Sequence, residues 1–241
     1  MNILDISEVT KNFGGLTALN DIDMHIAKGE ILALIGPNGA GKSTMFDCVA
    51  GVYPPSSGAI HFKGQSIAGL KPWDLCRLGL ARTFQIVKPF AARTVLYNVM
   101  VGAFLRTSST DKARNKALAV LEMLRLDHRK DMLAGTLTIA DRKRLEIAKA
   151  LATEPELLLL DEVMAGLRPT EMDDMIAIIR QLRGDGITVF IIEHIMRAVM
   201  ALSDRVVVIH FGEKIAEGAP EDVTRDENVI RAYLGSDYAT S

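Results

Sequence analysis

The sequence of 241 residues predicts an α/β fold built on a mainly parallel sheet with crossover helices. Three observations predict it: an apolar strand that runs into a glycine-rich loop and a helix, a leucine strand that ends in two acidic residues, and an alternation of strands and helices over the last third of the chain. A chain of this length can bury a large core, either as one domain or as one core with a sizeable insertion.

The first part of the chain consists mainly of predicted strands. Short alternating or apolar patterns, bounded by Gly, Asn, Asp, Pro and Ser, occupy Ile3–Val9, Leu19–Ile26 and Ala59–Lys63. We therefore expect a β region before the first long helices.

A glycine-rich loop follows the apolar run Ile31–Ile35 and precedes an expected helix that starts near Met45. The loop fits the pattern G-x-x-x-x-G-K-[ST] at every fixed position. Glycines let successive N–H groups point inward at a phosphate, and the helix N-terminus adds partial positive charge. Lys42 is expected to reach the β- and γ-phosphates and Ser43 to hold Mg²⁺. A turn without a ligand is the weaker interpretation. The residues of the loop are Gly36, Pro37, Asn38, Gly39, Ala40, Gly41, Lys42, Ser43 and Thr44.

The middle of the chain has a helical pattern, with apolar residues three to four apart in Thr94–Phe104, Asp111–Leu126 and Ala140–Ala152. Strands and helices then alternate, which implies a parallel sheet. The expected strands are Leu157–Leu160, Ile187–Ile192 and Val206–Ile209, the helices lie near Thr170–Arg183 and His194–Leu202, and short outer helices are expected within Pro220–Leu234.

Two carboxylates follow the strand Leu157–Leu160 directly. Asp161 is the expected partner of Ser43 around Mg²⁺, and Glu162 is placed to polarise an attacking water. Taken alone, acidic residues at such a position have an equally good structural explanation, because they also stabilise helix starts. Together with the upstream loop, they indicate nucleotide hydrolysis.

The composition of the chain argues against several other classes of protein. Hydrophobic residues make up 49% and charged residues 24%, which is ordinary for a soluble globular chain, and a net charge of −2 argues against a nucleic-acid binder. The two cysteines, Cys48 and Cys76, lack disulfide or metal spacing, so reduced cytosolic thiols are expected. No apolar run reaches bilayer length and no signal-peptide pattern begins the chain, so membrane association would come through partner proteins.

The ordered set of motifs resembles the ATP-binding cassette (ABC) ATPases over essentially the whole chain. The set comprises Lys11-Asn-Phe-Gly-Gly15, the loop at Gly36–Thr44, Arg82-Thr-Phe-Gln85, Leu157–Glu162 and Ile191-Ile-Glu-His194. The resemblance implies a P-loop NTPase (RecA-like) core with a mainly parallel sheet, an N-terminal antiparallel β subdomain and an α-helical subdomain insertion. The boundaries we expect are residues 1–86 and 153–218 for the core, 87–152 for the helical subdomain, and 219–241 for C-terminal helices and tail.

Residue roles follow from the same resemblance. ATP and Mg²⁺ are the implied cofactors, with Phe13 stacking on adenine, Gln85 joining the Mg²⁺ and water shell, and His194 contacting the γ-phosphate. Lys42, Glu162, Gln85 and His194 are thus the implied catalytic residues. A core position for Phe13, and a surface or helix-start position for His194, are the structural alternatives.

One motif departs from the family. Its signature, Leu-Ser-Gly-Gly-Gln, grips the ATP bound to the opposing subunit; the aligned residues here are Leu137, Thr138, Ile139, Ala140 and Asp141. Both glycines are missing, so the Cβ of Ala140 is expected to crowd the phosphate, and Asp141 adds negative charge beside a polyanion. We therefore expect asymmetry. ATP on this chain's own loop is hydrolysed if a different partner supplies an intact signature, whereas the opposite site is slow or structural.

Further segments resemble the bacterial importer ATPases for branched-chain and other hydrophobic amino acids, namely Phe13–Leu19, Gly79–Gln85, Asp161–Leu167 and Arg231–Gly235. This implies two transmembrane permease subunits, a second and different ATPase subunit, a solute-binding protein, a dimer of ATPase domains when ATP is bound, and no nucleic acid. The chain would lie at the cytoplasmic face of the inner membrane, held there by the permeases.

Other functions remain open at this stage. Related cassettes serve urea, amides or lipopolysaccharide-type lipids. A soluble ABC ATPase of translation or DNA repair usually has a second cassette or a long coiled coil, and neither is present here. A non-hydrolytic regulator is suggested by the degenerate signature, but the intact Lys42, Asp161, Glu162 and His194 argue against it.

Overall fold

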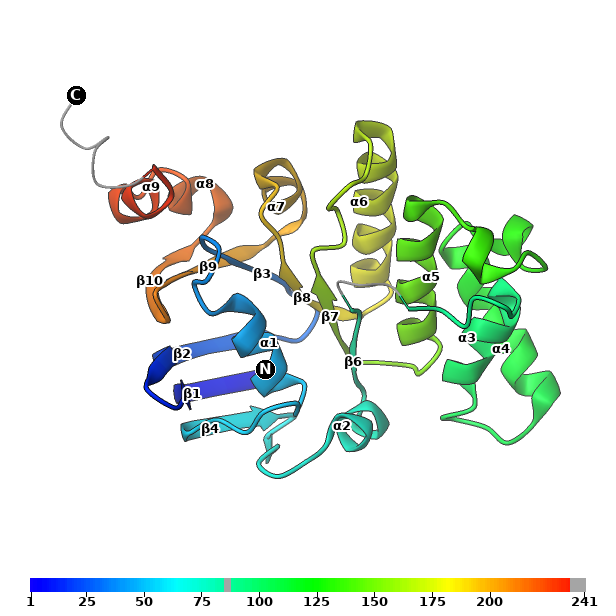
Figure 1. Cartoon of the computed structure of the whole chain (residues 1–241), viewed down its shortest axis with the longest axis horizontal. Coiled ribbons are helices and arrows are strands. Elements are labelled where there is room, and N and C mark those ends of the chain that lie inside the picture. Colours follow the sequence, from blue (N-terminus) through cyan, green and yellow to red (C-terminus); the bar gives the residue numbers. More distant parts are fainter. Residues whose placement is uncertain (85–87, 235–241) are drawn as a thin grey trace. The chain divides into compact units, whose positions relative to one another are not determined.

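The computed structural model describes residues 1–84 and 88–234 (Figure 1). The chain divides into two compact units, one formed by Met1–Leu75 with Thr188–Ser241 and the other by Cys76–Ile187. The segment Met1–Leu75 ends within helix α2 (Pro72–Leu78). The finer subdomain boundaries expected from the sequence stay predictions.

An antiparallel sheet begins the first unit, with strand order β2-β1-β4-β5. Along β2, Ile22, Met24 and Ile26 are buried and the residues between them are exposed, so the period-two pattern gives the sheet one core face. The strands are β1 (Asn2–Phe13), β2 (Leu16–Ala27), β4 (Ser57–Phe62) and β5 (Gln65–Ser66).

A second set of strands in this unit has the order β8-β3-β9-β10. The first three are parallel, and β10 pairs with β9 in the antiparallel sense. Every residue of β3 and β8 is buried, which is why both read as continuous apolar runs. The strands are β3 (Ile31–Ile35), β8 (Thr188–Ile192), β9 (Arg205–His210) and β10 (Glu213–Gly218), and the helices are α1 (Lys42–Val49), α7 (Met196–Leu202), α8 (Pro220–Val223) and α9 (Glu227–Leu234).

The second unit combines a parallel strand pair with packed helices. Strands β6 (Leu80–Arg82) and β7 (Leu157–Asp161) pair in parallel, and helix α3 packs against α4 and α5. At the α3–α5 contact, a Cβ on Gly102 would lie 2.5 Å from the carbonyl oxygen of Lys149, so only glycine permits this approach. The helices are α3 (Val95–Ala103), α4 (Thr110–Met123), α5 (Ile139–Leu151) and α6 (Pro169–Gly184), with 3-10 turns at Asp127–Arg129 and Ala134–Thr136.

The predicted fold class is confirmed: a parallel α/β core, an antiparallel N-terminal sheet and inserted helices are all present. Strands β6 and β10 and helix α2 were not predicted. Strand β6 has only three residues, and β10 is an edge strand of partly exposed and exposed residues, so neither carries a clear apolar alternation.

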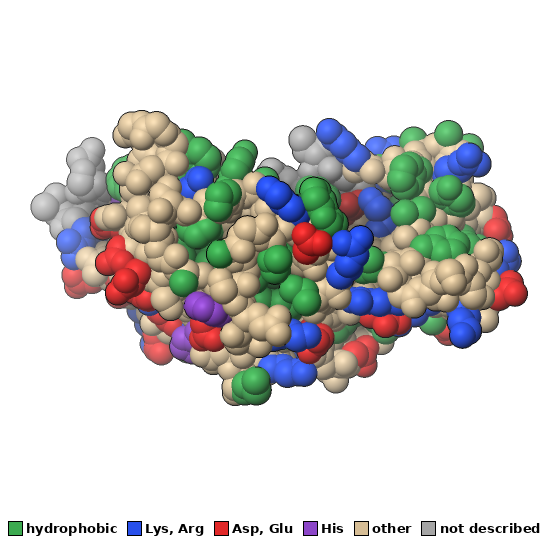
Figure 2. Space-filling model, turned by 90° about the horizontal axis from the view of Figure 1, so that it is seen from below, with side chains coloured by type: hydrophobic (Ala, Val, Ile, Leu, Met, Phe, Trp, Pro, Cys, Tyr) green, Lys and Arg blue, Asp and Glu red, His purple; other side chains and the backbone are tan. Residues whose placement is uncertain are grey.

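The surface carries charges of both signs. Figure 2 shows acidic and basic side chains interspersed over the face that it displays, in keeping with a net charge of −2. Among the helices formed by residues 1–84 and 88–234, none is both long enough and apolar enough to cross a bilayer.

Candidate active site

The phosphate loop begins where β3 ends and closes at the first turn of α1. Gly39 and Gly41 have positive φ angles of 80° and 108°, and Gly41 caps α1. A hydrogen bond from another segment also stabilises the loop: the N–H of Gly212 in the β9–β10 turn donates to the carbonyl oxygen of Ala40 at 2.9 Å. The strand, loop and helix thus have the order and geometry that phosphate binding requires.

Gly36 is the most tightly enclosed residue of this loop. Its φ angle is 150°, and an added Cβ would lie 2.1 Å from the carbonyl oxygen of Ile209 in β9. Gly39, by contrast, has no atom within 4 Å of such a Cβ. Alanine substitutions at these two glycines therefore separate the effect of steric crowding from that of backbone strain.

We expect Gly36→Ala to lower the free energy of unfolding by about 3 kcal/mol or more, because overpacking against a backbone oxygen adds to the left-handed strain. Gly39→Ala keeps only the strain and should cost about 1–2 kcal/mol. Guanidinium unfolding of both variants measures this. Equal losses in the two variants would show that the contact with Ile209 does not restrict the loop.

The ammonium group of Lys42 is buried inside the loop. Its side chain donates to the carbonyl oxygens of Gly36 at 2.6 Å and Pro37 at 2.8 Å. Both acceptors are neutral, and an anionic phosphate oxygen is a stronger acceptor for an ammonium group. Ser43 is the next residue along α1 and is exposed, so its hydroxyl group is accessible at the same helix start.

His194 lies at the same sheet edge as the loop. Strands β3 and β8 are parallel neighbours, with Leu34 opposite Ile192, so the segments that follow them leave the sheet at one edge. The His194 side chain is exposed there. Its contact with the γ-phosphate stays a prediction.

Phe13 stands at the tip of the β1–β2 hairpin and is 40% exposed, so it is not a core aromatic. Its ring packs edge-to-face on Tyr53, with centroids 5.3 Å apart, and the ammonium group of Lys11 lies 4.9 Å from its centroid. A partly exposed ring held in this way can offer a face to a base, and its adenine-stacking role stays a prediction. Tyr53 was not predicted as its support.

Asp161 ends β7 in the second unit and is 6% exposed. Its carboxylate pairs with the guanidinium group of Arg82 at 3.0 Å, and its N–H donates to the hydroxyl group of Thr83 at 3.2 Å. Arg82 is the last residue of β6 and Thr83 follows it, so this parallel strand fixes the position of the carboxylate. Sequence reasoning missed Arg82 as the partner, since its 79-residue separation from Asp161 gives no local signal.

Glu162 adopts a left-handed backbone conformation with φ of 48°, which is strained for a residue with a side chain. Its carbonyl oxygen accepts a hydrogen bond from the ammonium group of Lys143 at 2.8 Å. Lys143 lies on α5, the helix that begins at the signature residues, and was not predicted. The expected role of Gln85 falls on a residue outside the described part of the chain.

The signature residues form the capped start of α5. The hydroxyl group of Thr138 accepts a hydrogen bond from the N–H of Asp141 at 3.2 Å, and the Asp141 carboxylate lies 3.8 Å from the guanidinium group of Arg129. Ala140 is buried, whereas Ile139 is 62% exposed. Leu137 is buried as well, and the expected crowding of a phosphate by the Cβ of Ala140 stays a prediction.

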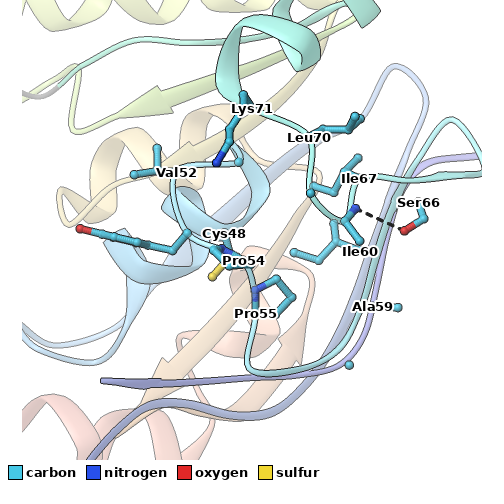
Figure 3. Close-up of a pocket in the computed structure, with 15 residues that line it drawn as sticks. Cys48, Val52, Pro54, Pro55, Ala59, Ile60, Ser66, Ile67, Leu70 and Lys71 are labelled. Carbon is cyan, nitrogen blue, oxygen red and sulfur yellow. Dashed lines mark hydrogen bonds between the residues drawn. The ribbon is translucent and has the colours of Figure 1, made fainter. Parts of the chain in front are cut away.

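A separate cavity of about 210 Å³ is lined by Cys48 of α1 and by residues between Gly51 and Lys71, and the phosphate loop is not part of it. Figure 3 shows Cys48 among its lining residues, together with Pro54, Ile60 and Lys71. Burial raises the pKa of the Cys48 thiol from 9.0 to about 11, because the low-dielectric surroundings disfavour the thiolate.

We expect one fast-reacting thiol at pH 8, that of the partly exposed Cys76, and one slow thiol, that of Cys48. Kinetics with a chromogenic disulfide reagent, before and after unfolding, measure this. Because the folded pKa lies above 9.0, the thiol of Cys48 stabilises the fold below pH 9, and this contribution is lost as pH rises through about 11. Equal reaction rates of the two thiols in the folded protein would contradict the predicted protection of Cys48.

The fold and these residues define a phosphate-loop nucleotide-binding ATPase. The family model "ABC transporter" matches residues 19–165, and a second model, "Branched-chain amino acid ATP-binding cassette transporter", matches residues 213–239. The chain therefore belongs to the ABC transporter family as an ATP-binding cassette, and the resemblance inferred from its motifs is confirmed.

Named relatives are similar over nearly the whole chain. The high-affinity branched-chain amino acid transport ATP-binding proteins BraF of Pseudomonas aeruginosa and LivG of Escherichia coli are each 39% identical, covering 97% of this chain and 98% of the relative. Among solved structures, a nucleotide-free ATP-binding cassette from an ABC transporter has a TM-score of 0.90 at 32% identity, covering 98% of this chain and 100% of that one. A cassette in its ADP conformation gives a TM-score of 0.89, also at 32% identity, covering 98% and 99%.

Proposed function

We propose that this protein is the ATP-hydrolysing subunit of a membrane importer for branched-chain or other hydrophobic amino acids. The observation that carries the proposal is a complete phosphate loop in a chain that is 39% identical, over 97% of its length, to named branched-chain amino acid transport ATP-binding proteins. ATP binding draws the ATPase domains together and hydrolysis releases them, and the permease converts this motion into transport.

Lys42 and the loop amides bind the β- and γ-phosphates in this proposal, and Phe13 stacks on adenine. Ser43 and Asp161 hold Mg²⁺. The residues suit that ion, because Asp161 offers carboxylate oxygens beside Arg82 and Ser43 is an accessible hydroxyl group. Among the described residues, no group of three or more His, Cys, Asp or Glu side chains forms a cage, and Mg²⁺ is usually held by one or two protein oxygens plus substrate phosphates. The ion would neutralise charge on the transferring phosphoryl group.

Glu162 orients the attacking water and accepts its proton, since a carboxylate next to the Mg²⁺ ligand is the chemically suitable general base. Its backbone strain and its bond from Lys143 hold the residue at a defined place after β7. His194 contacts the γ-phosphate, and Gln85 joins the Mg²⁺ and water shell.

A permease would dock on the second unit. Tyr97 and Val101 of helix α3 and its C-cap residue Phe104 are exposed at spacings of four and three residues, which places them on one face. Phe90, in the segment that follows Gln85, is 54% exposed, and its ring lies 6.4 Å from that of Tyr97. An apolar face of this kind suits a protein partner and would place the chain at the cytoplasmic face of the membrane.

The partner ATPase would differ from this chain. The start of α5 is capped by Thr138, carries the carboxylate of Asp141 and exposes Ile139, so it suits a γ-phosphate poorly. A second ATPase with an intact signature would complete the site on this chain's loop. The opposite site, completed by this chain, would be slow.

Affinity purification of the tagged chain from detergent-solubilised native membranes, with identification of the bound proteins by mass spectrometry, tests this function. We expect two permeases and one distinct ATPase with an intact signature. Recovery without permeases would contradict the importer function. Recovery with a second copy of this chain as the sole ATPase would contradict the asymmetry between the two ATP sites.

A further inference from the structure

The turn between β9 and β10 joins the phosphate loop to β2 through backbone hydrogen bonds. The N–H of Gly212 in this turn donates to the carbonyl oxygen of Ala40 at 2.9 Å, and the carbonyl oxygen of Gly212 accepts from the N–H of Asn20 in β2 at 2.8 Å. The side-chain amide of Asn20 also donates to the carboxylate of Glu213, the next residue of the turn, at 2.9 Å. Both backbone polar groups of Gly212 are therefore used, one toward the loop and the other toward β2.

Strand β2 also lies directly against the loop. The carbonyl oxygen of Ala18 is 2.5 Å from the position of a Cβ on Gly41, the glycine that caps α1, and 2.9 Å from the position of a Cβ on Gly212. The φ angles of Gly41 and Gly212 are 108° and 81°, a region that glycine adopts without strain. The loop, β2 and the β9–β10 turn thus meet backbone to backbone, and neither glycine has room for a side chain.

This contact links the two parts of the expected nucleotide site. Strand β2 begins at Leu16, which pairs with Phe13 across the β1–β2 hairpin, and Phe13 is the ring expected to stack on adenine. Residues 18–20 of the same strand contact the phosphate loop and the β9–β10 turn. One strand therefore connects the ring at the hairpin tip to the place where Gly212 and the loop meet.

We propose that Gly212 is a positioning residue for nucleotide binding. Its hydrogen bonds to Ala40 and Asn20 hold the loop amides against β2, at a fixed distance from Phe13, without Gly212 serving as a phosphate ligand. The loop is thereby ordered before nucleotide binds, so less binding free energy is lost in ordering it. The inference rests on the proposed function only in requiring that the loop bind nucleotide, and it holds whatever the complex transports.

Gly212→Ala tests the proposal in the purified full chain. The new Cβ would meet the carbonyl oxygen of Ala18 at 2.9 Å, so the turn must shift and its bond to Ala40 weakens. We expect the dissociation constants of ADP and a non-hydrolysable ATP analogue, measured by calorimetric titration, to rise about 2- to 10-fold, the range for loss of one hydrogen bond. In the assembled complex, KM for ATP should rise by the same factor with kcat within about 2-fold, because the loop binds ground and transition states alike.

Gly64→Ala is the matched control. Gly64 lies between β4 and β5 in the same unit, and its φ of 75° is close to the 81° of Gly212. Among the described residues, none beyond its chain neighbours has an atom within 4 Å of an added Cβ. The control should lower the melting temperature through backbone strain and leave both dissociation constants unchanged. An equal rise in the two variants, or unchanged constants in Gly212→Ala, would overturn the proposal.

Amide hydrogen exchange in the unmodified protein decides the proposal even if Gly212→Ala does not fold. Coupling between two sites is reciprocal, so a turn that promotes nucleotide binding is itself stabilised by bound nucleotide. By NMR of the 15N-labelled chain, we expect saturating ADP to slow exchange of the Gly212 N–H about 2- to 10-fold and to leave that of Gly64 unchanged. Equal exchange of Gly212 with and without ADP would overturn the proposal. Failure of the unmodified chain to bind ADP would contradict the proposed function itself, and this inference with it.

Discussion

Glu162→Gln is expected to lower steady-state ATP turnover of the assembled complex by about 100-fold or more, the usual contribution of a general base. The amide keeps the size and hydrogen-bonding capacity of the side chain but does not accept the proton of the attacking water. ATP binding should be retained, because Lys42 and the loop amides are intact. Phosphate release and ATP titration measure the two effects separately.

Turnover also tests the asymmetry between the two sites. If the site completed by Thr138–Asp141 is slow, the complex has one productive site, and it is the one that holds Glu162. Near-full activity of the Glu162→Gln complex would therefore contradict the account. Glu122→Gln, an exposed glutamate on α4, is the control for loss of one negative charge in the same unit.

Lys42→Ala is expected to weaken ATP binding by about 10- to 100-fold, the range for losing hydrogen bonds between a charged donor and an anion. The loop keeps its glycines, so its fold should survive. Fluorescence titration with a labelled ATP analogue measures the affinity, and thermal unfolding without nucleotide checks the fold.

The control for this variant is Lys112→Ala, an exposed lysine on α4. It should bind ATP like the unmodified protein. An unchanged affinity in Lys42→Ala would show that the lysine does not contact the phosphates, and the assignment of the loop would fail.

The elements that sequence predicts well are those whose signal is local. Strand β3, the loop and α1 follow one another within 19 residues, from Ile31 to Val49, and each has its own pattern. Strand β7 and the acidic pair Asp161 and Glu162 are equally local. The parallel core follows from alternating strands and helices, so the fold class was predictable.

The contacts that hold the candidate site were not predictable, because each joins residues far apart in the chain. Arg82 and Asp161 are 79 positions apart, Lys143 and Glu162 are 19 apart, and Gly212, which donates to Ala40, lies near the other end of the chain. At the signature, the sequence did not show that Ala140 is buried and Ile139 exposed. Such outcomes depend on tertiary packing rather than on motif spacing.

Uptake of radiolabelled leucine by cells that lack this chain, complemented with either the unmodified protein or Glu162→Gln, tests the central claim most directly. The account predicts that the unmodified protein restores uptake, that unlabelled valine and isoleucine compete, and that the variant restores none. Leucine uptake that is unaffected by loss of the chain, or restored equally by Glu162→Gln, would contradict it.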